Sequence, residues 1–119
     1  MATLTQLVDD VVANKFELRH GGLNIGRHPD NDIQIDDSAV SAHHARLEGT
    51  PNEHFPQFSE YYLVDLGSTN GTFVNNIKLS KRHRLRHNDL VRVGWNTFKF
   101  VDNEESDLEK TSHMLSTNS

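Results

Sequence analysis

Apolar and polar residues alternate in short runs along the chain, which is the period of a half-buried β-strand. Leu23 and Ile25 flank Asn24, and Ile33 and Ile35 repeat the pattern. Similar runs recur to residue 101, and Gly, Pro, Asn and Asp separate them, which are the residues that favour turns. Helical periodicity is almost absent. The pattern predicts an all-β fold, a two-sheet β-sandwich of about eleven short, mostly antiparallel strands.

Three stretches give more specific expectations. Residues 4–12 fit either a short helix or a strand with a bend. Residues 49–60 are polar and contain two prolines, so we expect a long loop there, followed by a strand over 61–65. Asn75 and Asn76 are expected to form a turn between short strands, because Asn tolerates positive φ better than most residues.

The length of 119 residues predicts one domain. Hydrophobic residues make up only 34%, so the core should be modest. Residues 1–101 carry the strand pattern and form the predicted domain. Residues 102–119 are acidic and then rich in Ser and Thr, with few apolar positions, and are predicted to be a disordered tail.

Charge and composition narrow the classes of function. A net charge of −5 argues against nonspecific nucleic-acid binding, and the absence of cysteine excludes disulfides and thiolate zinc sites. The N-terminus lacks a basic start followed by an apolar run, so no signal peptide is expected. No stretch approaches the roughly 20 apolar residues of a membrane span. We therefore expect a cytoplasmic protein that does not insert into membranes.

The stretch from Asp65 to Asn75, DLGSTNGTFVN, is the most unusual part of the sequence. Two glycines, one Asn and three hydroxyl residues occupy the six positions 67–72 between apolar strand ends. An ordinary hairpin needs only two such residues, so a hairpin alone does not explain the composition. Small hydroxyl and amide side chains can point outward at a ligand, which predicts one half of a phosphate-binding site. The other half is predicted to be Arg27 with Ser41.

These signals occur in a fixed order: Gly26-Arg27, then Ser41-x-x-His44, then the 67–72 stretch. In this respect the sequence resembles the forkhead-associated (FHA) domain, a reader of phosphothreonine peptides, over roughly residues 4–101. The resemblance implies an FHA/SMAD-like β-sandwich. It also implies a phosphothreonine-dependent protein-binding adaptor in Ser/Thr-kinase signalling, with no catalytic activity and no cofactor.

The resemblance also assigns roles to residues. Arg27, Ser41 and Thr69 would contact the phosphate, and Asn70 would bind the peptide backbone. The residues expected to hold the loops in place are Gly26, His44, Gly67 and Gly71.

The chemistry of phosphothreonine fits these residue types. The group carries nearly two negative charges and three acceptor oxygens, and a guanidinium can donate two parallel hydrogen bonds to it, which a Lys cannot do. One departure from the family is Ala42, where a polar residue often helps to hold the peptide. This departure supports the alternative hypothesis, a scaffold or oligomerisation module of the same fold that binds partners without phosphate.

Simpler interpretations exist for several of these residues. Arg27 could form an ion pair with Asp32 or Asp36, and the hydroxyls of Ser41 and Thr69 could only cap turns. The eight histidines raise the question of a metal site. Adjacent His43 and His44 should point to opposite faces of a strand, and His83 and His87 have helical spacing in a stretch that does not look helical. We therefore expect no metal site. Nothing resembles a catalytic triad either.

Two further features could involve partners. Six of the twelve Lys and Arg residues lie between Lys78 and Arg92, which predicts a solvated edge or, alternatively, a contact surface for an acidic partner such as the tail. The ends of the chain are expected to be flexible. They carry threonines that, once phosphorylated, could occupy the protein's own site: Thr3, Thr5, Thr111 and Thr117.

Overall fold

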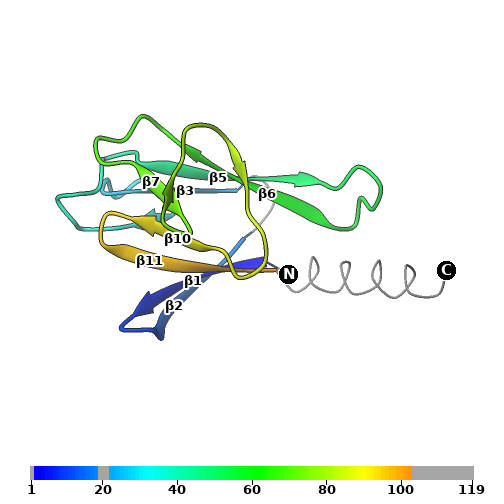
Figure 1. Cartoon of the computed structure of the whole chain (residues 1–119), viewed down its shortest axis with the longest axis horizontal. Coiled ribbons are helices and arrows are strands. Elements are labelled where there is room, and N and C mark those ends of the chain that lie inside the picture. Colours follow the sequence, from blue (N-terminus) through cyan, green and yellow to red (C-terminus); the bar gives the residue numbers. More distant parts are fainter. Residues whose placement is uncertain (1, 19–21, 103–119) are drawn as a thin grey trace.

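The computed structural model describes residues 2–18 and 22–102, which form eleven strands in two sheets and contain no helix. One sheet has six strands in the order β2-β1-β11-β10-β7-β8, and the other has five in the order β4-β3-β5-β6-β9. Of the registered pairs, only β3 with β4 is parallel. The predicted all-β sandwich is therefore confirmed (Figure 1). The strands are β1 (Ala2–Val8), β2 (Val11–Glu17), β3 (Leu23–Gly26), β4 (Ile33–Gln34), β5 (Ala45–Pro51), β6 (Ser59–Asp65), β7 (Thr72–Val74), β8 (Ile77–Lys78), β9 (His83–Arg84), β10 (Leu90–Val93) and β11 (Asn96–Asp102).

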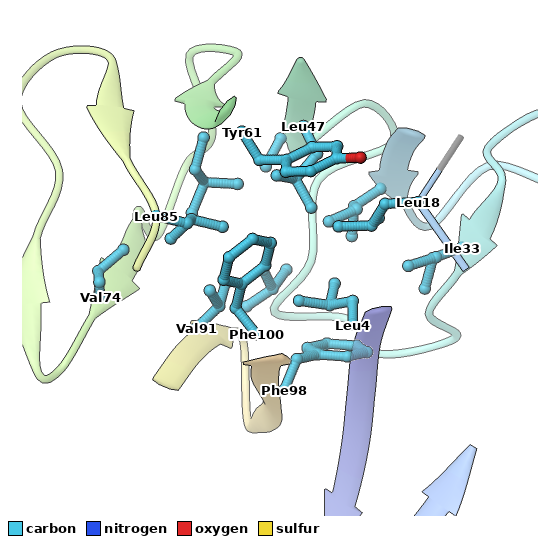
Figure 2. Close-up of a cluster of buried hydrophobic side chains, with 14 of the residues drawn as sticks. Leu4, Leu18, Ile33, Leu47, Tyr61, Val74, Leu85, Val91, Phe98 and Phe100 are labelled. Carbon is cyan, nitrogen blue, oxygen red and sulfur yellow. The ribbon is translucent and has the colours of Figure 1, made fainter. Parts of the chain in front are cut away.

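The hydrophobic core fills the space between the two sheets. Phe98 and Phe100 alternate with half-buried neighbours along β11 and are fully buried, as the period-2 pattern requires. Leu4 lies beside them, while Leu47 and Tyr61 approach from the opposite sheet (Figure 2). Burying one such side chain contributes about 1.5–3 kcal/mol. The core therefore holds the sheets together and fixes where each loop leaves them.

The N-terminal segment is a β-hairpin, so the alternative of a short helix over residues 4–12 is wrong. Strands β1 and β2 pair in antiparallel register, and the turn between them is Asp9-Asp10 with φ of 52° and 63°. Two successive positive φ values define the type I′ turn, whose twist matches that of paired strands. Asp tolerates this conformation less readily than Gly or Asn, which explains why the sequence pattern did not reveal the turn.

The N-terminal threonines belong to this hairpin. Thr3 and Thr5 lie in β1 between β2 and β11, and Thr5 is only 5% exposed because Lys15 and Lys99 flank it on the neighbouring strands. The expectation that these two threonines sit on a flexible end is therefore wrong. The other two threonines of that expectation lie in 103–119, outside the described residues.

The expected loop over 49–60 is shorter than predicted. Strands β5 and β6 pair as far as Pro51 with Ser59, so only residues 52–58 form the turn. The Asn52 side chain accepts hydrogen bonds from the backbone N–H groups of His54 and Phe55, both at 2.9 Å, and these bonds stabilise the turn. Figure 1 shows this hairpin extending away from the loops that follow β3 and β6.

The predicted turn at Asn75-Asn76 is confirmed, whereas the last strand ends later than predicted. Asn75 and Asn76 form the predicted turn between β7 and β8, with φ of 49° and 68°. Strand β11 reaches Asp102, one residue into the stretch predicted as a tail. The rest of that stretch lies outside the described residues.

Candidate functional site

Three loops meet at one end of the sandwich. The backbone N–H of Arg27 donates to the Ser41 carbonyl at 3.0 Å, and the N–H of Thr69 donates to the Ser41 hydroxyl at 3.1 Å. The Asn70 side chain donates to the Ala39 carbonyl at 2.9 Å. Residues separated by up to 31 positions are thereby joined directly. The two stretches that were predicted to form the halves of one site therefore lie at the same end of the sandwich.

Asp65, at the end of β6, organises the loop that follows it. One carboxylate oxygen accepts from the N–H groups of Gly67 and Ser68 at 3.1 and 3.0 Å. The other accepts from the Ser68 and Thr72 hydroxyls at 2.6 and 2.7 Å, and the Ser68 hydroxyl accepts from the N–H of Gly71 at 2.9 Å. Burial alone would raise the pKa of Asp65, but these hydrogen bonds outweigh it and hold the pKa below its ordinary value.

From the sequence, Asp65 was placed at the end of a strand and the start of the unusual stretch, but no role was predicted for its carboxylate. The available signal was an Asp placed two residues before a Gly in a turn, where its carboxylate can accept backbone N–H groups. The carboxylate gives this loop a single shape before any ligand arrives.

His44 joins the loop around Ser41 to the loop after β6. It is fully buried, and its Nδ1 accepts the N–H of Ser41 at 3.0 Å. The proton is therefore assigned to Nε2, which donates to the Gly71 carbonyl at 2.9 Å. Both ring nitrogens are satisfied within the protein, so the imidazole faces no solvent or ligand.

Three glycines at this end have different structural reasons: one lies against a neighbouring loop, and two adopt positive φ. A Cβ atom on Gly26 would lie 2.3 Å from the Ala42 carbonyl oxygen and 2.8 Å from the Asn31 side chain, distances that no side chain can occupy. Gly67 and Gly71 have φ of +78° and +87°, which glycine adopts without strain. Asn31, which the sequence analysis did not single out, is buried and bridges the two loops that flank Gly26.

Arg27 is exposed, and the protein backbone holds its side chain at one point. Its Nε donates to the Val40 carbonyl at 3.1 Å. Among the described residues no carboxylate pairs with its guanidinium, so the alternative of an ion pair with Asp32 or Asp36 is not supported. Asp32 instead accepts the backbone N–H of Asn24 at 2.7 Å. The terminal guanidinium nitrogens are therefore oriented and available.

All four residues predicted to bind the phosphopeptide line one surface hollow. Arg27 and Ser41 come from the loops after β3 and before β5, and Thr69 and Asn70 come from the loop after β6. Ala42 also lines the hollow and adds only a methyl group. Among the residues that line this hollow the charge comes from Arg27, while the hydroxyl and amide groups supply hydrogen-bonding atoms around it.

A second hollow adjoins the first and shares Ala39 and Asn70 with it. Its other walls include Phe73 and Trp95, and the Trp95 side chain is 83% exposed. The Arg92 guanidinium lies over the Phe73 ring at 4.0 Å, which gives this wall both apolar and cationic character. Sequence analysis missed this hollow, although a Trp beside a glycine turn was a signal for it.

The histidines considered for metal binding are separated as expected. His44 is buried and His43 is exposed, so the two side chains point in different directions, although both precede β5 and neither lies in a strand. His83 lies in β9 and His87 accepts the backbone N–H of Asp102 at 3.0 Å, so these two do not share a helix. In the part of the chain that the structure describes, no helix is long and apolar enough to cross a membrane.

Fold and loop geometry together define a small β-sandwich domain whose loops around Arg27, Ser41 and Thr69 gather at one end. The sequence profile of the FHA domain matches residues 23–94, and the chain belongs to the FHA-domain family.

Similar proteins extend this assignment. The chain is 38% identical over 96 residues to the glycogen accumulation regulator GarA of Mycolicibacterium smegmatis, covering 79% of this chain and 54% of GarA. It therefore spans about half the length of such relatives. An FHA domain solved in work on phosphothreonine-dependent FHA interactions superposes with a TM-score of 0.69 at 30% identity, covering 85% of this chain and 95% of that one. Mycobacterium tuberculosis EmbR, solved with a low-affinity phosphopeptide, gives 0.70 at 28% identity, covering 84% of this chain and 24% of EmbR.

Proposed function

We propose that this protein is a phosphothreonine-dependent adaptor that binds phosphorylated proteins in Ser/Thr-kinase signalling. The observation that carries the proposal is the state of Arg27. Its Nε is anchored to the Val40 carbonyl, and within the described ranges its guanidinium has no carboxylate partner. An oriented, unneutralised guanidinium beside hydroxyl groups is suited to a dianionic ligand.

In this proposal the first hollow receives the phosphate. Arg27 donates two parallel hydrogen bonds to phosphate oxygens, and the hydroxyls of Ser41 and Thr69 donate further bonds. Because the Ser41 hydroxyl already accepts the N–H of Thr69, its own proton is directed elsewhere and can serve a ligand. Hydrogen bonds to charged groups contribute about 1.5–3 kcal/mol each, and association offsets several kcal/mol. Reversible binding in the micromolar range follows.

Asn70 links the phosphate to the rest of the peptide. One of its amide protons is used by the Ala39 carbonyl, which leaves the second proton and the side-chain oxygen for the peptide backbone. Asn70 and Ala39 also line the neighbouring hollow beside Trp95. Peptide residues next to the phosphothreonine would therefore lie along this apolar wall.

The proposal also covers catalysis, location, domain bounds and the residues that hold the loops. FHA domains and relatives such as GarA are binding or regulatory modules. We extend this to the absence of catalytic activity in this chain, to a cytoplasmic location and to a recognition domain over residues 1–101, with 102–119 as a separate tail. Gly26, His44, Gly67 and Gly71 would act by holding the loops.

The test is a titration of the full chain with three matched peptides that carry phosphothreonine, phosphoserine or unmodified threonine, followed by calorimetry or fluorescence anisotropy. Only phosphorylated peptides should bind measurably. Phosphothreonine should be preferred about fourfold over phosphoserine, since one buried methyl contributes about 0.8 kcal/mol. Equal binding of the unmodified peptide would defeat the proposal in favour of a phosphate-independent scaffold.

Two arginine variants locate the binding. Arg27→Ala should remove at least about 2 kcal/mol of binding free energy, because the hydrogen bonds it loses go to a charged group. Arg82→Ala is the matched control, since Arg82 is also partly exposed but pairs with Glu48 at 3.4 Å. Unchanged affinity in Arg27→Ala, with the fold intact by circular dichroism, contradicts the proposed site.

A further inference from the structure

The loops that flank the proposed phosphate site also carry an exposed cluster of two histidines and one aspartate. His28 and Asp30 lie in the loop after β3, and His43 lies just before β5. One ligand atom from each residue falls within 4.8 Å of the other two. None of the three faces the hydrophobic core, and none has a role in the proposed binding of phosphopeptides.

We propose that His28, Asp30 and His43 form a zinc site with three protein ligands and at least one open coordination position. The ligand atoms would be Nδ1 of His28, a carboxylate oxygen of Asp30 and Nε2 of His43. The inference goes beyond the proposed function. It also departs from the expectation of no metal site, which compared only histidines close in sequence.

The distances in the cluster are close to those that zinc requires. His28 Nδ1 lies 2.7 Å from Asp30 Oδ1, and His43 Nε2 lies 3.0 Å from the same oxygen. Tetrahedral zinc with bonds of about 2.0–2.2 Å places its ligand atoms about 3.4 Å apart. Each nitrogen therefore has to move away from the shared carboxylate oxygen by about half an ångström, while the distance between the two nitrogens, which is within 4.8 Å, has to settle at about the same 3.4 Å. A cation would replace the protons that now join the three groups.

The hydrogen bonding of His28 is also unusual. Its Nδ1 lies 3.2 Å from the backbone N–H of Asp30, which needs an acceptor, and 2.7 Å from the Asp30 carboxylate, which needs a donor. One nitrogen cannot satisfy both groups at once. Coordination would satisfy the carboxylate, because the lone pairs of Nδ1 and of the carboxylate oxygen would then point at one cation, and the N–H of the exposed Asp30 would then bond to water.

The backbone that carries the ligands is already held in place. The N–H of His28 donates to the Ala42 carbonyl at 3.1 Å, and the buried Asn31 side chain lies 2.8 Å from both the Ala42 and the His28 carbonyls. The two imidazole rings of His28 and His43 stack with centroids 5.6 Å apart. Binding therefore requires little ordering of the loops, which favours affinity at an exposed site.

The ligand types select the metal. Imidazole suits zinc and its neighbours in the first transition row, whereas calcium and magnesium prefer oxygen ligands alone. Two imidazoles and one carboxylate leave at least one tetrahedral position for water or for an oxygen or nitrogen atom of a bound partner. The site is of the open type rather than the closed structural type.

The test uses the full chain without an affinity tag, at a pH above the ordinary histidine pKa of about 6.5. Zinc chloride is titrated by calorimetry, and cobalt(II) serves as a spectroscopic probe of coordination. We expect one equivalent of zinc to bind. Backbone NMR shifts should concentrate in residues 27–31 and 41–44.

Variants then assign the ligands. His43→Asn and His28→Asn should each weaken zinc binding at least about tenfold, since even residues behind the ligands matter by 10–100-fold. His54→Asn, at an exposed histidine in the distant 52–58 turn, is the matched control and should bind as the unaltered chain does. Unchanged affinity in His43→Asn, equal loss in His54→Asn, or less than one equivalent bound would each overturn the site.

Discussion

Carboxylates are used differently at two surfaces of this molecule. At the loop end, Asp65 accepts four hydrogen bonds from its own loop, and Arg27 remains without a carboxylate partner among the described residues. On the surface formed by β5, β6 and β9, Glu48 lies 3.4 Å from Arg82, whose guanidinium also lies 3.7 Å above the Tyr62 ring. The first arrangement orients a free charge, whereas the second neutralises one.

The second surface contains Arg82 and Arg84 of the basic segment from Lys78 to Arg92, while Lys78 and Arg92 themselves lie in β8 and β10 of the other sheet. Arg84 lies 3.8 Å from Glu60, and the Tyr62 hydroxyl donates to Glu60 at 2.8 Å, which raises the pKa of Tyr62. The number of basic residues in a segment is therefore a poor guide to a site for anions. A single arginine held by the backbone is better suited to one, and the five predictions below start from this difference.

The largest effect is expected from Asp65→Asn. An amide nitrogen in place of one oxygen would face two donors, which leaves part-buried hydrogen-bonding groups unsatisfied and should lower the free energy of unfolding by about 2 kcal/mol. Thermal unfolding should show a decrease in Tm of about 10 °C. Asp36→Asn is the matched control, because Asp36 is exposed and has no hydrogen bond within the described residues.

The same pair of variants yields a pH dependence. The lowered pKa of Asp65 means that its stabilisation is fully present above the unfolded-state value of about 3.9 and is lost as the pH falls through the folded-state pKa. The stability difference between Asp65→Asn and the unaltered chain should therefore shrink in acid. A difference that stays constant from neutral pH to strongly acid solution would show that the charge of Asp65 is not responsible.

The next effect is expected from Arg27→Lys. This change keeps the charge but removes the planar fork, so phosphopeptide affinity should fall about tenfold, which corresponds to about 1.4 kcal/mol. Arg82→Lys should leave affinity unchanged, because Arg82 belongs to the neutralised surface. Equal affinities of Arg27→Lys and the unaltered chain, measured by anisotropy, would mean that Arg27 acts only through its charge.

A smaller effect is expected from Trp95→Ala. The ring borders the hollow next to Asn70 and is 83% exposed, so a bound peptide can cover only part of it. Phosphopeptide affinity should fall two- to fivefold, or about 0.5–1 kcal/mol. Phe55→Ala is the matched control, since Phe55 is 45% exposed in the turn at the other end of β5 and β6. Equal losses in both variants would argue against contact at Trp95.

The parts of this structure that sequence predicted are those encoded by neighbouring residues. Period-2 alternation predicted the strands that carry Ile25 and Phe98, and the Asn75-Asn76 pair predicted its turn. The Asp9-Asp10 turn was not predicted, because it places Asp at positive φ. Pairing of β5 with β6 continues to Pro51, because partner strands can extend through residues that locally favour a loop.

The residues of the candidate site also fall into those that sequence predicted and those that only the folded chain reveals. Residues such as Arg27 and Thr69 were predicted because the family motif contains them. Asn31 was missed because its role depends on a loop 11 positions away, whose carbonyl it reaches only in the folded chain. The cluster of His28 with His43 was missed for the same reason, since the histidines are 15 positions apart in sequence.

The smallest effect is expected from Arg82→Ala, which tests the surface where glutamates neutralise the arginines. The Arg82–Glu48 pair joins side chains that are 49% and 39% exposed, so solvent screens it strongly. Its loss, together with the contact above Tyr62, should change the free energy of unfolding by less than about 1 kcal/mol in chemical denaturation. Lys81→Ala, an exposed neighbour, sets the background for removing a positive charge from this segment. A phosphopeptide affinity that falls in Arg82→Ala as far as in Arg27→Ala would mean that both surfaces bind the ligand, and that neutralisation by glutamate does not distinguish them.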